Sequence, residues 1–89
     1  MDKIIIEKPS EEKLAGLGVK FWPIWEKEIS TFPWHYDCDE YCYLLEGEVE
    51  IETSEGIYSI KAGDFVTFKK GLLCTWNVKK AVRKHYKFD

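Results

Sequence analysis

Apolar and polar residues alternate along most of this chain, in short segments that turn residues separate. The clearest case is residues 48–52, where Val49 and Ile51 alternate with acidic residues. A period of two is typical of a strand with one face on a core and one face in solvent. Gly56 and Gly63 follow in sequences typical of tight turns between neighbouring strands.

This pattern predicts that nearly all of the chain after Val19 is strand and turn. Pro23 and Pro33 indicate sheet edges or bends, because proline has no backbone N–H to donate to a sheet. The expected strands and extended segments are residues 3–7, 22–25, 29–36, 40–46, 48–52, 57–60, 65–68, 74–78 and 82–88.

At most one short helical turn is expected, near the N-terminus. Ser10 can cap a turn that reaches Leu14, and Gly16 and Gly18 are expected to end it. No linker or internal repeat divides the chain, so residues 1–89 are predicted to form a single domain. Many short strands with almost no helix indicate an all-β fold, a small barrel or sandwich.

The composition narrows the classes of function. The net charge is −3 with acids and bases interspersed, so no basic face for nucleic acid is expected. Apolar runs such as Ile4-Ile5-Ile6 are too short to span a bilayer, and no secretory start is visible. We therefore expect a cytoplasmic protein without a membrane partner. Its three cysteines, Cys38, Cys42 and Cys74, are expected to be reduced thiols.

Two stretches of the chain have the spacing of a known family. Glu40 and Gly47 follow Trp34-His35-Tyr36, and a second block runs from Gly63 through Lys69-Lys70-Gly71 to Cys74. This spacing resembles the paired motifs of the cupins. The resemblance implies a cupin barrel, also called a double-stranded β-helix or jelly-roll. It also implies that Trp34, Tyr36 and Cys74 stand where metal-binding cupins carry three histidines.

A narrower resemblance covers residues 22–88. The run from Glu40 through Cys42-Tyr43 to Leu45-Glu46-Gly47-Glu48-Val49 is similar to small single-domain cupins grouped with the ureidoglycine aminohydrolase cupin domain. The activity in that name belongs to longer relatives that carry a metal. Whether this chain is an enzyme is therefore left open at this point.

Strand alternation predicts which side chains share the barrel interior. If Glu40 points inward, as the resemblance implies, then Cys42 and Leu44 do too. By the same parity, Trp76 lies on one face with Cys74, and Lys84 on one face with Tyr86 and Phe88. The predicted ligand-binding residues are Trp34, Tyr36, Glu40 and Trp76, and the predicted catalytic residues are Glu40, Cys74, Tyr36 and Lys84.

Each of these residues also has a purely structural interpretation. Trp34 and Trp76 can simply fill a small barrel. Glu40 can form a structural ion pair with Lys84, although a buried carboxylate also suggests a ligand contact. Lys84 is expected to be a partly exposed residue at a strand end, because lysine is seldom fully buried. Cys74 can be an inert apolar side chain as well as a reactive thiol.

Three functions follow, in order of preference. The first is metal-independent binding, without a cofactor, of a small polar organic molecule, with or without catalysis. The second is a metal-dependent aminohydrolase in which Glu40, Cys74 and either His35 or Tyr36 bind a transition metal, although alternation turns His35 away from the interior. The third is a structural or partner-binding barrel.

The outward face of strand 40–46 suggests self-association. Tyr41, Tyr43 and Leu45 would form an exposed apolar patch unless another segment covers them. The N-terminal strand 3–7, from the same chain or from a second subunit, is the expected cover. We therefore expect a homodimer.

Overall fold

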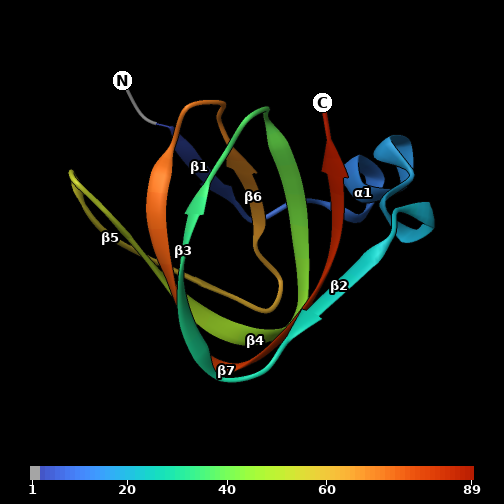
Figure 1. The fold of residues 1–89 in the computed structure, drawn as a ribbon. Coiled ribbons are helices and arrows are strands. Elements are labelled where there is room, and N and C mark those ends of the chain that lie inside the picture. Colours follow the sequence, from blue (N-terminus) through green and yellow to red (C-terminus); the bar gives the residue numbers. More distant parts are fainter. Residues whose placement is uncertain (1–2) are drawn as a thin grey trace.

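The computed structural model describes residues 3–89 as one antiparallel β-barrel with a short helical segment outside it (Figure 1). The sequence prediction of an all-β barrel is confirmed. The elements are β1 (Ile4–Glu7), α1 (Glu11–Leu17), the 3₁₀-helix η1 (Val19–Phe21), β2 (Ile24–Lys27), β3 (Ser30–His35), β4 (Glu40–Thr53), β5 (Gly56–Lys61), β6 (Phe65–Phe68) and β7 (Leu73–Phe88).

Two long strands, β4 and β7, form the frame of the barrel. They pair antiparallel from Glu40 opposite Phe88 to Glu52 opposite Thr75, and Figure 1 shows both curving around the closed lower end. The sheet order is β1-β6-β4-β7-β2, while β3 also pairs with β7 and β5 also pairs with β4. Strands β2, β3, β5 and β6 thus each pair with β4 or β7, and β1 pairs with β6.

Gly47 lets β4 bend without ending. Its φ of 105° is a conformation that glycine adopts readily, and a Cβ placed there would lie 2.5 Å from the carbonyl oxygen of Ala81 on β7. The β4–β7 register shifts on both sides of this position, as at a β-bulge. The predicted strands 40–46 and 48–52 are therefore one strand, and 74–78 and 82–88 are likewise joined in β7.

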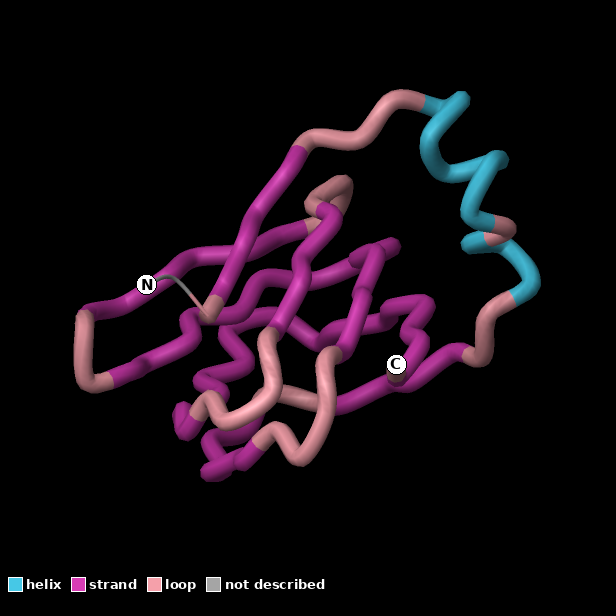
Figure 2. Tube along the Cα trace, turned by 90° about the horizontal axis from the view of Figure 1, so that it is seen from above, coloured by secondary structure: helices cyan, strands magenta, loops and turns pink. Residues whose placement is uncertain are grey.

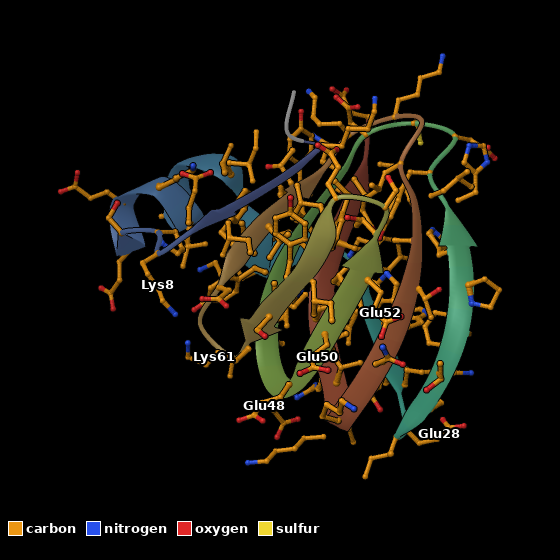
Figure 3. The ribbon with its side chains drawn as sticks, turned by 90° about the vertical axis from the view of Figure 1, so that its left-hand side faces the viewer. Lys8, Glu28, Glu48, Glu50, Glu52 and Lys61 are labelled. Carbon is orange, nitrogen blue, oxygen red and sulfur yellow. The ribbon has the colours of Figure 1, made fainter. Side chains whose placement is uncertain are left out.

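The acidic alternation on β4 behaves as the sequence predicts. Val49 and Ile51 are buried in the core, whereas Glu48, Glu50 and Glu52 lie along the outer face of the barrel (Figure 3). The tight turn before Gly56 joins β4 to β5, as expected from the sequence.

The helical segment is longer than the predicted turn. Ser10 caps α1 by accepting a hydrogen bond from the backbone N–H of Lys13, but the helix continues through Gly16 to Leu17 and ends at Gly18 in the left-handed conformation. Gly16 therefore does not break the helix. No helix within residues 3–89 has the length and apolar character needed to cross a bilayer.

The segment from α1 to η1 lies outside the barrel, against its wall (Figure 2). Leu14 and Val19 line a groove with Tyr43 and Leu45 of β4, so this segment covers part of the patch that we expected the N-terminal strand to cover. Strand β1 instead extends the sheet beside β6, with Ile5 opposite Thr67. Strand β1 of the same chain therefore does not cover this patch, and cover by β1 of a second subunit stays a prediction.

Candidate ligand-binding site

The barrel holds a cavity of about 180 Å³ near the end where β3 and β7 finish and β4 begins. We call it the aromatic cavity, because most of its lining consists of rings. Its lining residues are Trp25, Phe32, Trp34, Tyr36, Glu40, Trp76, Lys84, Tyr86 and Phe88. A cavity of roughly 150 Å³ in another protein binds benzene, so this volume suits a molecule with one ring.

A buried ion pair forms the polar part of the aromatic cavity. The Nζ atom of Lys84 lies 3.2 Å from Oε2 of Glu40 and 3.2 Å from Sγ of Cys42. Glu40 and Lys84 are each only 4% exposed. The expectation that Lys84 is partly exposed was therefore wrong: its side chain points into the barrel, where Glu40 and Cys42 receive its hydrogen bonds.

Two indole rings complete the surroundings of the Lys84 ammonium group. Nζ lies 4.7 Å from the ring centre of Trp76 and 5.0 Å from that of Trp25. Trp25 is placed there because β2 pairs with β7 so that Trp25 stands opposite Lys84. The face of an aromatic ring attracts a cation, and this attraction is worth about 2 kcal/mol or more where water is excluded.

Three titratable groups at the aromatic cavity, those of Lys84, Cys42 and Tyr36, are held in their protonated forms. Burial lowers the pKa of Lys84, but Cys42 and Glu40 outweigh this effect and the pKa is raised, which keeps the ammonium form. Burial raises the pKa of the Cys42 thiol to about 12. Burial, assisted by the nearby Glu40 charge, also raises the pKa of Tyr36. At neutral pH the site thus contains an ammonium, a thiol and a phenol.

The indole N–H of Trp76 lacks a well-aligned acceptor. Its Nε1 atom is buried and makes no hydrogen bond of good geometry among residues 3–89, although Tyr36 and Cys74 lie close enough for the indole to oppose the rise that burial causes in their pKa values. An indole N–H can only donate, and a buried donor without an acceptor costs about 1–3 kcal/mol. Because Trp76 lines the aromatic cavity, an acceptor atom of a molecule in the cavity could satisfy it.

The structure brings most of the predicted site residues together. Tyr36, Glu40, Trp76 and Lys84 line the aromatic cavity and are buried, with Tyr36 stacked on Phe68 at a ring-centre distance of 4.8 Å. Trp34 also lines the cavity but is 46% exposed. It stands near the end of β3, at the rim.

Cys74 lies near Trp76 but does not line the aromatic cavity. It is buried, and its thiol donates a weak hydrogen bond to the backbone oxygen of Trp34, 3.7 Å away. It lines an open groove beside Pro33 and Leu73 rather than the aromatic cavity. Burial raises the pKa of Cys74 to about 11, so it too is a thiol at neutral pH.

Five residues of the site were missing from the sequence prediction: Trp25, Phe32, Cys42, Tyr86 and Phe88. For four of them the sequence did contain a signal, because each lies an even number of positions from a predicted site residue and therefore on the same face of its strand. These are Phe32 with Trp34, Cys42 with Glu40, and Tyr86 and Phe88 with Lys84. Trp25 had no such signal. Its position depends on the pairing of β2 with β7, two segments far apart in the sequence.

The metal-binding alternative finds little support in the geometry. Within residues 3–89 no three side chains of histidine, cysteine, aspartate or glutamate come together as a metal site. His35 is half-exposed and lies 3.3 Å from the Asp37 carboxylate, Glu40 contacts Lys84, and Cys74 lies in a separate groove. These donors do not fit a transition metal, which takes three or four protein ligands at one point.

Comparison with known proteins identifies the fold family. The model of the EutQ-like cupin domain matches residues 14–86. The crystal structure of a DUF861-family protein from Thermotoga maritima is 56% identical, with a TM-score of 0.94, and the match covers 97% of this chain and 99% of that one. A search of curated proteins found no match.

Two further structures are more distant. A putative ethanolamine utilization protein Q from Salmonella typhimurium is 28% identical over 73% of this chain and 53% of its own, with a TM-score of 0.67. The EutQ protein of Clostridium difficile is 25% identical over 73% and 52%, also with a TM-score of 0.67. This chain thus matches about half of the length of each. The cupin prediction is confirmed, whereas the narrower resemblance to the ureidoglycine aminohydrolase group gains no support from these matches.

Proposed function

This chain belongs to the EutQ-like cupin domain family, and we propose that it binds a small, planar, polar organic molecule in the aromatic cavity without a metal ion. The observation that carries the proposal is the Trp76 N–H, which has no well-aligned acceptor among the described residues, inside a cavity that also holds the Glu40–Lys84 pair. Buried polar groups in proteins nearly always have a partner, so a donor left unpaired beside a cavity suggests a ligand acceptor.

A purely structural barrel accounts less well for the cavity. If nothing binds there, the aromatic walls of a cavity of about 180 Å³ lose packing contacts and face water. A buried ion pair also tends to stabilise a fold less than apolar residues of the same size. A barrel selected for stability alone would be expected to fill this space with apolar side chains.

Binding is favoured over covalent catalysis because no nucleophile is activated. A catalytic cysteine or lysine needs a lowered pKa, whereas the pKa values of Cys42, Cys74 and Lys84 are all raised. We therefore assign Trp34, Tyr36, Glu40 and Trp76 to ligand contact. Lys84 has the supporting role of holding the Glu40 carboxylate.

The names of the relatives suggest ethanolamine as one ligand to consider. Two similar structures are named for ethanolamine utilization or as EutQ, and ethanolamine carries an ammonium group. In this chain the Lys84 ammonium already occupies the position between Glu40 and the indole rings. A second cation would be repelled there, so ethanolamine is not the ligand that we favour.

Protein purified without added metal provides the test of this proposal. We expect less than about a tenth of an equivalent of transition metal, and a rise in melting temperature with at least one member of a panel of monocyclic amides, acids, amines and alcohols. The rise should shrink in Trp76→Phe and persist in the matched control Trp22→Phe, since Trp22 is not part of the cavity lining. A stoichiometric metal, or a panel without any effect on melting temperature, would contradict the proposal.

A further inference from the structure

The charges of the aromatic cavity cancel. Among residues 3–89, Glu40 and Lys84 are the charged residues of its lining, and their charged atoms lie 3.2 Å apart. An ion that enters a largely apolar site and loses its water must be paired, because losing its hydration costs far more than losing that of a neutral group. The cavity offers no surplus charge for such a pairing.

The Lys84 ammonium is already surrounded by protein groups. Glu40 and Cys42 accept two of its three N–H donors, and the faces of Trp25 and Trp76 lie against the same nitrogen. An anionic ligand would have to displace one of these contacts and would also meet the Glu40 carboxylate. A cationic ligand would meet Lys84 itself.

A donor and an acceptor that suit a ligand face the cavity, besides the Tyr36 hydroxyl. The donor is Nε1 of Trp76, which is buried and has no well-aligned acceptor among the described residues. The acceptor is the Glu40 carboxylate, which has about four lone-pair positions and gives one of them to Lys84. Both residues line the same cavity, between ring walls that include a stacked pair of Phe32 and Trp76.

We infer that the ligand is a neutral, planar molecule with a carbonyl oxygen and an N–H group, such as a small amide or lactam. The carbonyl oxygen would accept from Trp76, the N–H would donate to Glu40, and the flat body would lie against the aromatic walls. This inference rests on the proposed function, since it names the class of ligand for the same cavity.

Three probes of equal size and shape separate the charge classes: benzamide, benzoate and benzamidinium at pH 7. Titration calorimetry should give benzamide a dissociation constant at least about tenfold lower than that of either ion. If benzoate or benzamidinium binds as tightly as benzamide, or if none of the three binds while an acid, an amine or an alcohol of the panel does, the inferred ligand class is wrong although the cavity still binds a ligand. If no probe and no panel compound binds, the proposed function fails as well.

Two variants sharpen this test. Trp76→Phe keeps a ring but removes the N–H, so it should weaken the binding of benzamide by about five- to tenfold, the value of one hydrogen bond, while Trp22→Phe leaves that binding unchanged.

Lys84→Met should reverse the order of affinities of the three probes, because Glu40 and the two indole faces would then bind benzamidinium in place of the ammonium. An unchanged order of affinities in folded Lys84→Met would overturn the role given to Lys84. Should that variant fail to fold, the Trp76→Phe comparison decides, and equal benzamide binding in both tryptophan variants would contradict the inference.

Discussion

Lys84 shows how a charged side chain is kept inside a small barrel. Removing an ammonium or a carboxylate from water costs several kcal/mol per ion, even after the protein relaxes. The Glu40 carboxylate, the Cys42 sulfur and two indole faces together offset that cost for Lys84. Either charge left alone in this environment would remain uncompensated, which makes the pair strongly interdependent.

Urea unfolding of charge variants measures this interdependence. Glu40→Gln should lower the free energy of unfolding by about 3–5 kcal/mol, because it leaves a buried ammonium unpaired. Adding Lys84→Met should restore part of the loss, with a coupling of about 1–3 kcal/mol. The matched control is the exposed pair Lys80–Glu48, for which Glu48→Gln should cost less than about 1 kcal/mol. Equal losses at Glu40 and Glu48 would contradict the buried-pair interpretation.

The raised pKa of Cys42 predicts a loss of stability in alkali. The folded protein holds the thiol proton more tightly than an ordinary thiol of pKa 9.0 does, so this contribution is complete below about pH 9 and is lost as the pH rises toward about 12. Each such group changes the free energy of unfolding by at most about 1.4 kcal/mol per pH unit. The raised pKa values of Tyr36 and Lys84 act in the same direction.

Unfolding measured under reducing conditions between pH 8 and pH 11 isolates the contribution of Cys42 to the pH dependence of the free energy of unfolding. The decline in stability should be less steep in Cys42→Ala than in wild type, while Cys38→Ala, outside the cavity, keeps the wild-type slope. If Cys42→Ala shows the same slope as wild type, the thiol is not the group that titrates.

At the scale of elements, the bend of β4 at Gly47 decides the shape of the barrel. The sequence pattern stops there, and a break in alternation is usual at the end of a strand, so two strands were predicted. The structure keeps one strand because its pairing with β7 continues on both sides of the bulge. A local pattern cannot distinguish a turn from a bulge when the deciding contact comes from residues more than thirty positions away, such as Ala81.

Gly47→Ala tests the importance of this bend. The new methyl group would meet the carbonyl oxygen of Ala81 at 2.5 Å and the Cα of Val82 at 2.7 Å, both of them backbone atoms. We expect a loss of about 3 kcal/mol or more in the free energy of unfolding. Gly16→Ala is the control, since nothing lies within 4 Å of its added Cβ and alanine favours a helix by about 0.5–1 kcal/mol. A Gly47→Ala variant as stable as Gly16→Ala would show that β4 bends by another means.

For the whole molecule, the barrel and most of its interior could be predicted from the sequence. The resemblance placed Tyr36 and Glu40 on the inside, and the period of two put Cys42 and Leu44 on the same face as Glu40; all four are buried, whereas Lys84 was wrongly expected to be partly exposed. The period could not show that Cys74 lies outside the cavity lining or that Trp25 belongs to it. Both depend on which strands become neighbours, and that choice is made by packing over the entire barrel.

The whole molecule is also expected to self-associate. Strand β1 stands at one end of the sheet order and exposes Ile5 and Ile6, so a second copy could pair with its outer edge. Light scattering should then give about twice the 10.5 kDa mass of one chain. Ile5→Lys should shift this mass toward the monomer, whereas Ile57→Lys on the exposed face of β5 should not. A monomeric wild type would contradict the prediction.

The central claim, that the aromatic cavity binds a ligand through Trp76, is tested most directly by the indole N–H signals in a ¹H–¹⁵N NMR spectrum. The chain has four tryptophans, so each indole reports on its own position. On titration with the compound that raises the melting temperature most, the Trp76 signal should move furthest, those of Trp25 and Trp34 less, and that of Trp22 should stay in place. A titration that moves Trp22 or leaves Trp76 unmoved would contradict binding in the cavity.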